Sequence, residues 1–440
     1  MNGKALFLSL ALAVFATASV SAQNDVVAGI PVNYDESKVG DYKLGLPDPL
    51  VMNNGKKVKN ARQWMKKRRP EIVKLFETYE YGKWAAPKPK LRYDVIEDQG
   101  FGGLANRKQV TVYLSDKPDG PSVDVLIYLP KNVKGPAPLL LNLSFSQNNL
   151  AVSDPGVKPG TRWDPATGQR VKVEMPPMPA GAPARPRFGM DETIKTFLEA
   201  GYGFATLCYT DIEPDNKDGW KVGVRGLFFK DGQTQPANDE WGTISAWAWG
   251  ISTVMDYFEK DKDIDAKRIA LTGCSRLGKT TIWTAARDPR FAVVIPSCSG
   301  EGGAAISRRN YGENVAHITA ESRYRYQFCY NYSTYADRVN ELPVDANLLV
   351  ALIAPRPLLL QTGTTDTWSD SKGEWVAAVE AAKVYELFGK DALYPGAKVD
   401  EVPAADHPVY STLGYVIHEG GHGVMPQDWT YYLEFIKKHL

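Results

Sequence analysis

The sequence predicts an α/β protein with a mostly parallel central sheet and helices on both faces, a three-layer sandwich. Short apolar segments typical of buried strands alternate with helical segments from about residue 203 to the C-terminus. Strands that alternate with helices form parallel sheets covered on both faces. A large core is readily built, because 43% of the 440 residues are hydrophobic.

The first residues predict export. Lys4 precedes an apolar run over residues 5–18, and small residues follow it up to Ala22. The run is too short to span a membrane, so residues 1–22 are interpreted as a secretory signal peptide. We therefore expect a mature chain that begins at Gln23 and is secreted or periplasmic.

The next elements are one helix and two strands. Residues 61–81 carry large apolar side chains, such as Trp64 and Phe76, at roughly helical spacing. Residues 122–130 partly alternate between apolar and polar side chains, as in an antiparallel strand. Residues 137–145 are mostly apolar, as in a fully buried strand.

A Pro/Gly-rich insertion follows at about residues 153–189. Long irregular segments between core elements are usually functional or disordered, and surface loops carry many binding sites. We expect this insertion to form a wall of the active-site cleft.

The alternation then resumes to the end of the chain. Strands are predicted at residues 203–209, 268–272, 292–295, 357–362 and 413–417, and helices at 243–260, 280–287, 375–388 and 428–439. Because neither an internal repeat nor a linker interrupts it, residues 23–440 are predicted to form one domain. The net charge of +1 gives no electrostatic reason to expect nucleic acid or a membrane surface as partner.

The four cysteines are expected to be free thiols. An oxidising compartment would permit disulfides. Cys208 and Cys274, however, lie in or beside apolar strand segments, where buried free cysteine is common. Cys298 and Cys329 complete the set, and no spacing among the four resembles a zinc site.

A candidate nucleophile stands between the strand at 268–272 and the helix at 280–287. The run is Gly273-Cys274-Ser275-Arg276-Leu277-Gly278-Lys279. Glycines permit the sharp turn that exposes a serine hydroxyl, and the following helix points its N-terminus at the reaction centre. This is the context of the nucleophile elbow, so the α/β-hydrolase fold is predicted, with Ser275 as nucleophile.

The same residues also satisfy a phosphate-binding pattern, Gly-x4-Gly-Lys-Thr. Three features disfavour that interpretation. The interior of the loop has no further glycine, and the strand at 292–295 leads to no aspartate for Mg²⁺. An exported chain would also be separated from cellular ATP.

The base must come from five histidines, His317, His407, His418, His422 and His439. In α/β-hydrolases an acid and then a histidine follow the serine along the chain. That order excludes His317, and His439 lies at a helix end. Of the remaining three, His422 is favoured, because it lies in a glycine loop between the strand at 413–417 and the last helix.

The acid is expected in the loop after the strand at 357–362, which offers Asp366 and Asp370. A triad acid accepts the imidazole N–H, selects the tautomer and stabilises the imidazolium. Asp366 lies nearer the strand end and is favoured, whereas Asp370 suits the cap of the following helix.

His418 and His422 also match His-Glu-x-x-His, a zinc-protease pattern. That chemistry needs a continuous helix that places both imidazoles on one face. Two central glycines each cost a helix about 1 kcal/mol relative to alanine, so the match is interpreted as coincidence.

With these residues identified, the chain closely resembles the glucuronoyl esterases of carbohydrate esterase family 15, particularly bacterial members. The resemblance extends over essentially the whole mature chain. Residues 273–279 are identical to the signature Gly-Cys-Ser-Arg-x-Gly-Lys of the family. Gly420-Gly421-His422, followed by Asp428-Trp429, resembles its histidine loop.

The resemblance implies roles for four further residues. Arg276 is expected to stabilise the oxyanion through its backbone N–H and its guanidinium, because a fixed cation favours the developing alkoxide. Lys279, Glu313 and Trp368 are expected to contact the sugar ring.

One position departs from the family pattern. Many members carry a catalytic glutamate just before a Ser-Gly-x-Gly-Gly run, and here that position is Cys298. Glu301 lies within the run, and neither residue is expected to contact His422. Other members use an aspartate after a later strand, which Asp366 matches. The predicted triad is therefore Ser275, His422 and Asp366.

The implied reaction is hydrolysis, through an acyl-enzyme, of the ester between a (4-O-methyl-)glucuronoyl unit of glucuronoxylan and a lignin alcohol. The resemblance implies no metal and no cofactor, and a monomer is expected. Two alternatives remain. One is a sugar deacetylase or other carboxylesterase on the same fold. The other is a carbohydrate-binding relative without catalysis, which the cysteine at position 298 suggests.

Overall fold

The computed structural model describes residues 25–84, 88–117, 119–164, 166–167, 169–173 and 189–440. The expected signal peptide, residues 1–22, lies outside these residues, as does the part of the expected insertion at residues 174–188. Over the described ranges, none of the helices has the length and apolar character that crossing a membrane requires.

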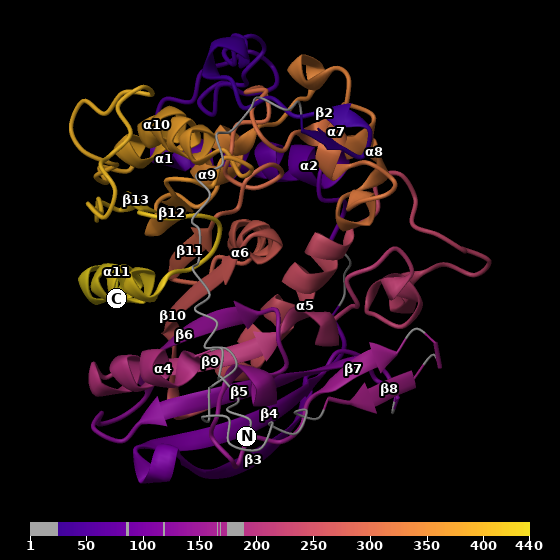
Figure 1. The fold of residues 1–440 in the computed structure, drawn as a ribbon, viewed down its shortest axis with the longest axis vertical. Coiled ribbons are helices and arrows are strands. Elements are labelled where there is room, and N and C mark those ends of the chain that lie inside the picture. Colours follow the sequence, from indigo (N-terminus) through magenta and orange to yellow (C-terminus); the bar gives the residue numbers. More distant parts are fainter. Residues whose placement is uncertain (1–24, 85–87, 118, 165, 168, 174–188) are drawn as a thin grey trace, which may run out of the picture.

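A nine-stranded sheet in the order β13-β12-β11-β10-β6-β9-β5-β4-β3 forms the centre of the molecule (Figure 1). The strands from β13 to β9 in that order are parallel, and β5, β4 and β3 continue the sheet antiparallel. The strands of this sheet are β3 (Arg92–Gly100), β4 (Ala105–Tyr113), β5 (Ser122–Pro130), β6 (Ala137–Ser144), β9 (Gly203–Cys208), β10 (Ile264–Cys274), β11 (Val293–Ser297), β12 (Leu358–Gly363) and β13 (Leu413–His418). Two small hairpins lie apart from it, β1 (Val26–Val27) with β2 (Ile30–Pro31) and β7 (Thr161–Asp164) with β8 (Gln169–Lys172).

Helices connect and cover the strands. They are α1 (Ala61–Gln63), α2 (Arg69–Tyr79), α3 (Asn148–Ala151), α4 (Met190–Glu199), α5 (Thr243–Phe258), α6 (Arg276–Arg287), α7 (Val315–Ile318), α8 (Tyr330–Ser333), α9 (Ala346–Ala351), α10 (Ser371–Leu387) and α11 (Pro426–His439). Short 3₁₀ turns lie in the loops between them, and a π-helical turn over Trp64–Arg68 joins α1 to α2.

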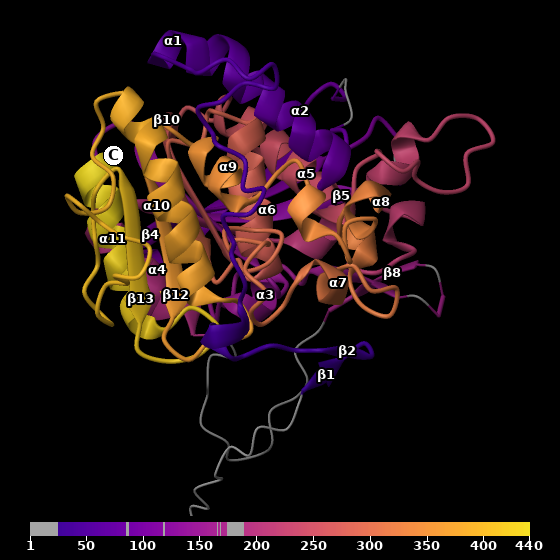
Figure 2. The same cartoon turned by 90° about the horizontal axis from the view of Figure 1, so that it is seen from above.

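The sheet separates two hydrophobic cores. Helices α4 and α11 pack on one face, and α5, α6, α9 and α10 pack on the other (Figures 1 and 2). Successive side chains of a strand point to opposite faces. Leu139 and Leu141 of β6 accordingly belong to one core and Leu140 to the other. The predicted three-layer α/β-hydrolase architecture is confirmed.

Two strands of the central sheet, β3 and β4, were not predicted from the sequence, nor were the strands of the two small hairpins. All residues of β3 except the last are exposed, because this strand forms the edge of the sheet. Its position depends on hydrogen bonds to β4 rather than on burial, so no apolar pattern marks it.

The described part of the expected insertion contains the hairpin β7–β8. Arg170 Nη2 donates a hydrogen bond to Asp211 O at 2.8 Å, in the 3₁₀ turn Tyr209–Asp211 that follows β9. The hairpin therefore supports the segment after β9. A role as cleft wall stays a prediction.

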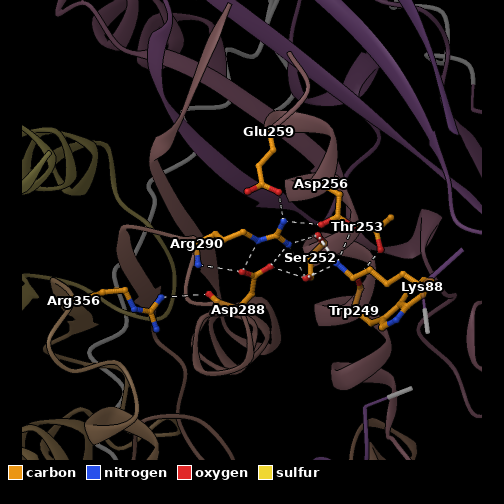
Figure 3. A network of polar contacts seen from close by, with 9 residues as sticks. All are labelled: Lys88, Trp249, Ser252, Thr253, Asp256, Glu259, Asp288, Arg290 and Arg356. Carbon is orange, nitrogen blue, oxygen red and sulfur yellow. Dashed lines mark hydrogen bonds and ion pairs between the residues drawn. The ribbon is translucent and has the colours of Figure 1, made fainter. Parts of the chain in front are cut away.

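A polar network ties the C-terminal end of α6 to α5 (Figure 3). Asp288 is 5% exposed, and Oδ2 of its carboxylate accepts hydrogen bonds from Arg290 Nη2 and Ser252 Oγ, each at 2.6 Å. Arg290 also pairs with Asp256 at 2.7 Å and with Glu259 at 2.6 Å. Burial acts to raise the pKa of Asp288, but the hydrogen bonds from Arg290 and Ser252 outweigh it, and the pKa lies below its usual value.

Asp288→Asn is expected to lower the free energy of unfolding by about 2 kcal/mol at neutral pH, since a hydrogen bond to a charged group contributes about 1.5–3 kcal/mol. A carboxyl whose pKa is lowered by folding stabilises the fold fully above its unfolded pKa, about 3.9. This contribution is lost as the pH falls through the lower folded pKa. Urea unfolding at neutral and acid pH should therefore show a difference from wild type that disappears in acid.

Glu259→Gln is the matched control, because it neutralises another carboxylate that pairs with Arg290. The Glu259 side chain is 48% exposed. An exposed ion pair contributes at most about 1 kcal/mol. Equal losses in the two variants would show that burial of Asp288 does not determine the strength of the network.

Candidate active site

Ser275 lies at a sharp turn between β10 and α6. Its φ of 60° and ψ of −126° are unusual for a residue with a side chain and indicate local strain. A Cβ at Gly273 would lie 2.8 Å from Leu277 O, and one at Gly278 would lie 2.6 Å from Ser297 O. Both glycines are therefore required by close backbone contacts, as in a nucleophile elbow.

The other candidate groups follow neighbouring strands. Asp215 comes after β9, Cys298 after β11, Asp366 after β12 and His422 after β13, while Ser275 follows β10. Because these strands are parallel and adjacent, their carboxyl ends meet at one edge of the sheet, where α/β proteins usually form their sites.

His422 and Asp366 are hydrogen-bonded. His422 Nδ1 lies 2.7 Å from Asp366 Oδ2 and 3.1 Å from Ser369 Oγ. The Asp366 side chain is 2% exposed, whereas that of His422 is 42% exposed. With Nδ1 engaged, Nε2 is left to accept a proton, which is the tautomer that a general base needs.

The two groups shift each other's pKa. The hydrogen bond that His422 donates to Asp366 raises the pKa of His422 above its usual value, against the effect of burial. Burial acts to raise the pKa of Asp366, but the hydrogen bond that its carboxylate accepts from His422 lowers it below its usual value. The described residues include no hydrogen bond between Ser275 Oγ and His422, and in free enzymes such bonds often tighten only with substrate.

Two other candidates have structural roles. Asp370 accepts a hydrogen bond from Gly373 N at 3.0 Å, which caps α10, and it pairs with Arg309 at 2.8 Å. His418 ends β13, and its Nδ1 lies 2.8 Å from the buried Asp428 carboxylate. No helix joins His418 to His422, which agrees with dismissal of the zinc-protease pattern.

Arg276 forms an ion pair with Asp215. Its guanidinium also lies over the Tyr324 ring, 4.6 Å from the ring centre. Burial acts to lower the pKa of Arg276, but the Asp215 carboxylate raises it above its usual value. Asp215 is held by three further donors, Tyr209 OH at 2.7 Å, Tyr326 OH at 2.8 Å and Gln327 Nε2 at 2.9 Å.

Sequence reasoning missed Asp215, Ser369 and Arg323. Asp215 could have been considered from the sequence, because it follows the predicted strand that becomes β9. The carboxyl end of β9 lies at the same edge of the sheet as Ser275. No local pattern distinguishes Ser369, although it lies between the two aspartates that were considered.

Lys279 follows the elbow in α6, and Glu313 and Trp368 contact each other nearby. Lys279 is 5% exposed, and its Nζ donates to Ser299 O at 2.6 Å. Glu313 pairs with Arg323 at 2.7 Å, and its N–H donates to Trp368 O at 2.8 Å. The Arg323 guanidinium lies 5.0 Å from the centre of the half-buried Trp368 ring.

Burial shifts the pKa values of Glu313 and Lys279 toward their neutral forms. Burial raises the pKa of Glu313, although the positive charges of Lys279 and Arg323 act to lower it. It lowers the pKa of Lys279, against the negative charge of Glu313. Opposite charges thus partly compensate the cost of desolvation on both sides.

Cys298 lies closer to the histidine than the sequence analysis expects. Its Sγ, a nitrogen of His422 and an oxygen of Asp366 all lie within 4.8 Å of one another, and Sγ donates to Gly423 O at 3.4 Å. Within the described ranges this trio is also the one cluster of side chains that could hold a metal ion. The hydrogen bond between His422 and Asp366 already explains why two of these three side chains lie close together.

Glu301 is engaged elsewhere. Its Oε1 accepts hydrogen bonds from Ser307 Oγ at 2.7 Å and Tyr332 OH at 2.5 Å, and burial raises its pKa to about 8. These contacts agree with the expectation that Glu301 does not orient His422. All four cysteines are free, as the sequence predicts.

Comparisons with known proteins find similar esterases. A family model described as "Glucuronyl esterase, fungi" matches residues 169–389. A carbohydrate esterase from an unknown prokaryotic organism is 40% identical over 409 residues, which cover 93% of this chain and 92% of the relative. A 4-O-methyl-glucuronoyl methylesterase from Podospora anserina is 27% identical over 387 residues, which cover 85% of this chain and 68% of the relative.

Solved structures are similar over nearly the same length. A glucuronoyl esterase from Solibacter usitatus has a TM-score of 0.83 at 43% identity, with coverage of 92% of this chain and 100% of that protein. One from Teredinibacter turnerae has a TM-score of 0.75 at 31% identity, with coverage of 92% of each chain.

Proposed function

The chain belongs to the glucuronoyl esterases of carbohydrate esterase family 15, and from this premise we propose the role of each group at the sheet edge. It is a serine esterase that hydrolyses the ester between a (4-O-methyl-)glucuronoyl unit of glucuronoxylan and a lignin alcohol. Ser275 is the nucleophile, His422 the base and Asp366 the acid. The observation that carries the proposal is the 2.7 Å hydrogen bond between His422 Nδ1 and Asp366 Oδ2, beside the strained elbow.

The reaction proceeds in two halves. Ser275 Oγ attacks the ester carbonyl while its proton passes to His422 Nε2, and the tetrahedral intermediate collapses when the alcohol leaves with that proton. The acyl-enzyme is then attacked by water, which gives its proton to His422. Collapse of the second intermediate releases glucuronate and returns the proton to Ser275.

Arg276 stabilises both tetrahedral intermediates. It is the first residue of α6, so its N–H lies in the first turn, where backbone N–H groups lack intrahelical acceptors. Its guanidinium adds a fixed cation that Asp215 and Tyr324 hold in place. Lys279, Glu313 and Trp368 bind the sugar ring, and the half-buried indole of Trp368 supplies an apolar face.

Arg276→Ala is expected to weaken transition-state stabilisation by roughly 2–4 kcal/mol, with the loss mainly in kcat. Arg276→Lys should recover only part of it, because an ammonium lacks the planar fork. Asp215→Asn is the companion variant, since it keeps the guanidinium but removes its ion pair, and a smaller loss in kcat is expected. Steady-state kinetics on benzyl glucuronate provides the measurement. An effect of Arg276→Ala confined to KM would assign Arg276 to substrate binding alone.

The substrate class is tested by three compounds. Benzyl glucuronate should be hydrolysed faster than benzyl galacturonate and faster than acetyl groups on xylan. Faster release of acetate would favour the sugar deacetylase instead. A monomeric, exported protein is part of the proposal, and size-exclusion chromatography and the N-terminus of the mature protein would test those two points.

A further inference from the structure

A cavity of about 910 Å³ lies beside the candidate active site. One wall is the segment between β9 and α5, and the other consists of residues 321–330. The segment between β9 and α5 projects from the body of the molecule near α8 in both views (Figures 1 and 2). The volume of the cavity lies within the range of about 300–1,000 Å³ that is typical of ligand pockets.

The cavity and the active site share a wall. Tyr326 lines the cavity, and its OH donates at 2.8 Å to Asp215, which forms an ion pair with Arg276. Arg323 and Tyr324, by contrast, contact groups of the active site, Trp368 and Arg276 respectively. Residues 323–326 thus lie between the two sites and contact groups of both.

The lining combines aromatic rings with neutral hydrogen-bonding side chains. Trp220 and Tyr326 are half-buried, Tyr330 is 46% exposed, and Gln235 and Asn238 add amides. Flat rings pack against the C–H faces of a sugar while amides bond its hydroxyl groups, and such amphipathic contacts are usual where one ligand face is apolar and another polar.

The charged side chains of the lining nearly balance: Lys217, Lys221, Arg225 and Arg325 are cationic, and Asp218, Glu240 and Glu321 are anionic. Arg225 pairs with the buried Glu213. Lys221 pairs with Asp218 at 2.8 Å, and Arg325 pairs with Glu321 at 2.5 Å. A polyanion would be recognised by a marked excess of cations, and an aromatic lignin unit would make less use of the amides than a sugar does. The lining therefore fits a neutral, hydroxyl-rich ligand best.

We propose that this cavity binds neutral sugar units of the polysaccharide that carries the ester. The identity of that polysaccharide, a xylan, rests on the proposed function. The cavity adds affinity for the polymer without taking part in the chemical steps, so its contribution is confined to long substrates.

Binding is tested without turnover. Ser275→Ala protein is titrated with xylohexaose by calorimetry at low and high salt, alone and with Trp220→Ala or Tyr330→Ala added. We expect binding that is insensitive to salt and weakened about tenfold by either substitution, a fold-change that corresponds to about 1.4 kcal/mol. Tyr93→Ala is the control, because Tyr93 is 38% exposed on the edge strand β3 and outside the cavity lining.

Kinetics provides the second measurement. Trp220→Ala should lower kcat/KM about tenfold for a glucuronoyl ester attached to a xylo-oligosaccharide and leave that for benzyl glucuronate unchanged. Three results would overturn the proposal. The first is no binding of xylohexaose, and the second is equal weakening of that binding by Tyr93→Ala. The third is that an aryl lignin dimer displaces xylohexaose and that Trp220→Ala weakens binding of the dimer but not of xylohexaose. If xylohexaose binds as expected while benzyl glucuronate is not hydrolysed, the cavity assignment stands and the proposed function fails.

Discussion

Ser275→Ala is expected to lose about three or more orders of magnitude in kcat while it folds as the wild type does. The residues of a serine triad act as a unit, so loss of the proposed nucleophile should leave only the contributions of oxyanion stabilisation and substrate binding. Hydrolysis of benzyl glucuronate provides the measurement, with circular dichroism to verify the fold. Activity near that of the wild type would remove the whole mechanism.

Ser275→Gly provides a second readout of the same residue. A φ of 60° strains any residue with a Cβ but not glycine. The glycine variant should therefore be as inactive as the alanine variant but at least as stable as the wild type in thermal unfolding. Such a result would show that strain at the elbow is maintained for function.

Asp366→Asn is expected to lower kcat by roughly 10²–10⁴-fold, because an amide in this place favours the wrong imidazole tautomer. His422 must be neutral to act as base, so activity falls as the pH drops through its pKa. Asp366 raises that pKa, and the variant should therefore lose activity at a lower pH than the wild type. The dependence of kcat/KM on pH measures this displacement.

Two matched substitutions distinguish the acid from its neighbours. Glu301→Gln should be mild, because that carboxyl is bonded to Ser307 and Tyr332. Cys298→Ser should also be mild, because a thiol does not stabilise an imidazolium as a carboxylate does. Addition of Cys298→Glu to Asp366→Asn should restore part of the activity, since Cys298 Sγ lies within 4.8 Å of the His422 ring nitrogen. A severe loss in Glu301→Gln with an active Asp366→Asn would assign the acid to the Gly-Gly run.

Much of the fold could be predicted because its strands are buried and its helices amphipathic. The interval 122–130 matches β5, and the strand at 413–417 is extended by one residue to His418. Helix α6 begins at Arg276, earlier than the predicted residue 280. Its first turn contains glycine and polar side chains, which give no apolar periodicity, and the elbow determines where it starts. The edge strand β3 was missed because it lacks a buried face.

Sequence by itself determined the elbow that holds Ser275, the proposed nucleophile, and the class of the protein. A strand, a glycine-flanked serine and a helix are consecutive, so the elbow is a local structure that its own residues encode. The tertiary structure decided the contacts: Asp366 bonds to His422, Asp370 caps α10, and Arg276 pairs with Asp215. Parallel pairing of Gly363 with His418 brings the loops after β12 and β13 side by side, so that Asp366 meets His422. Such a contact joins segments more than fifty residues apart, and no local pattern specifies it, because it depends on how neighbouring strands align.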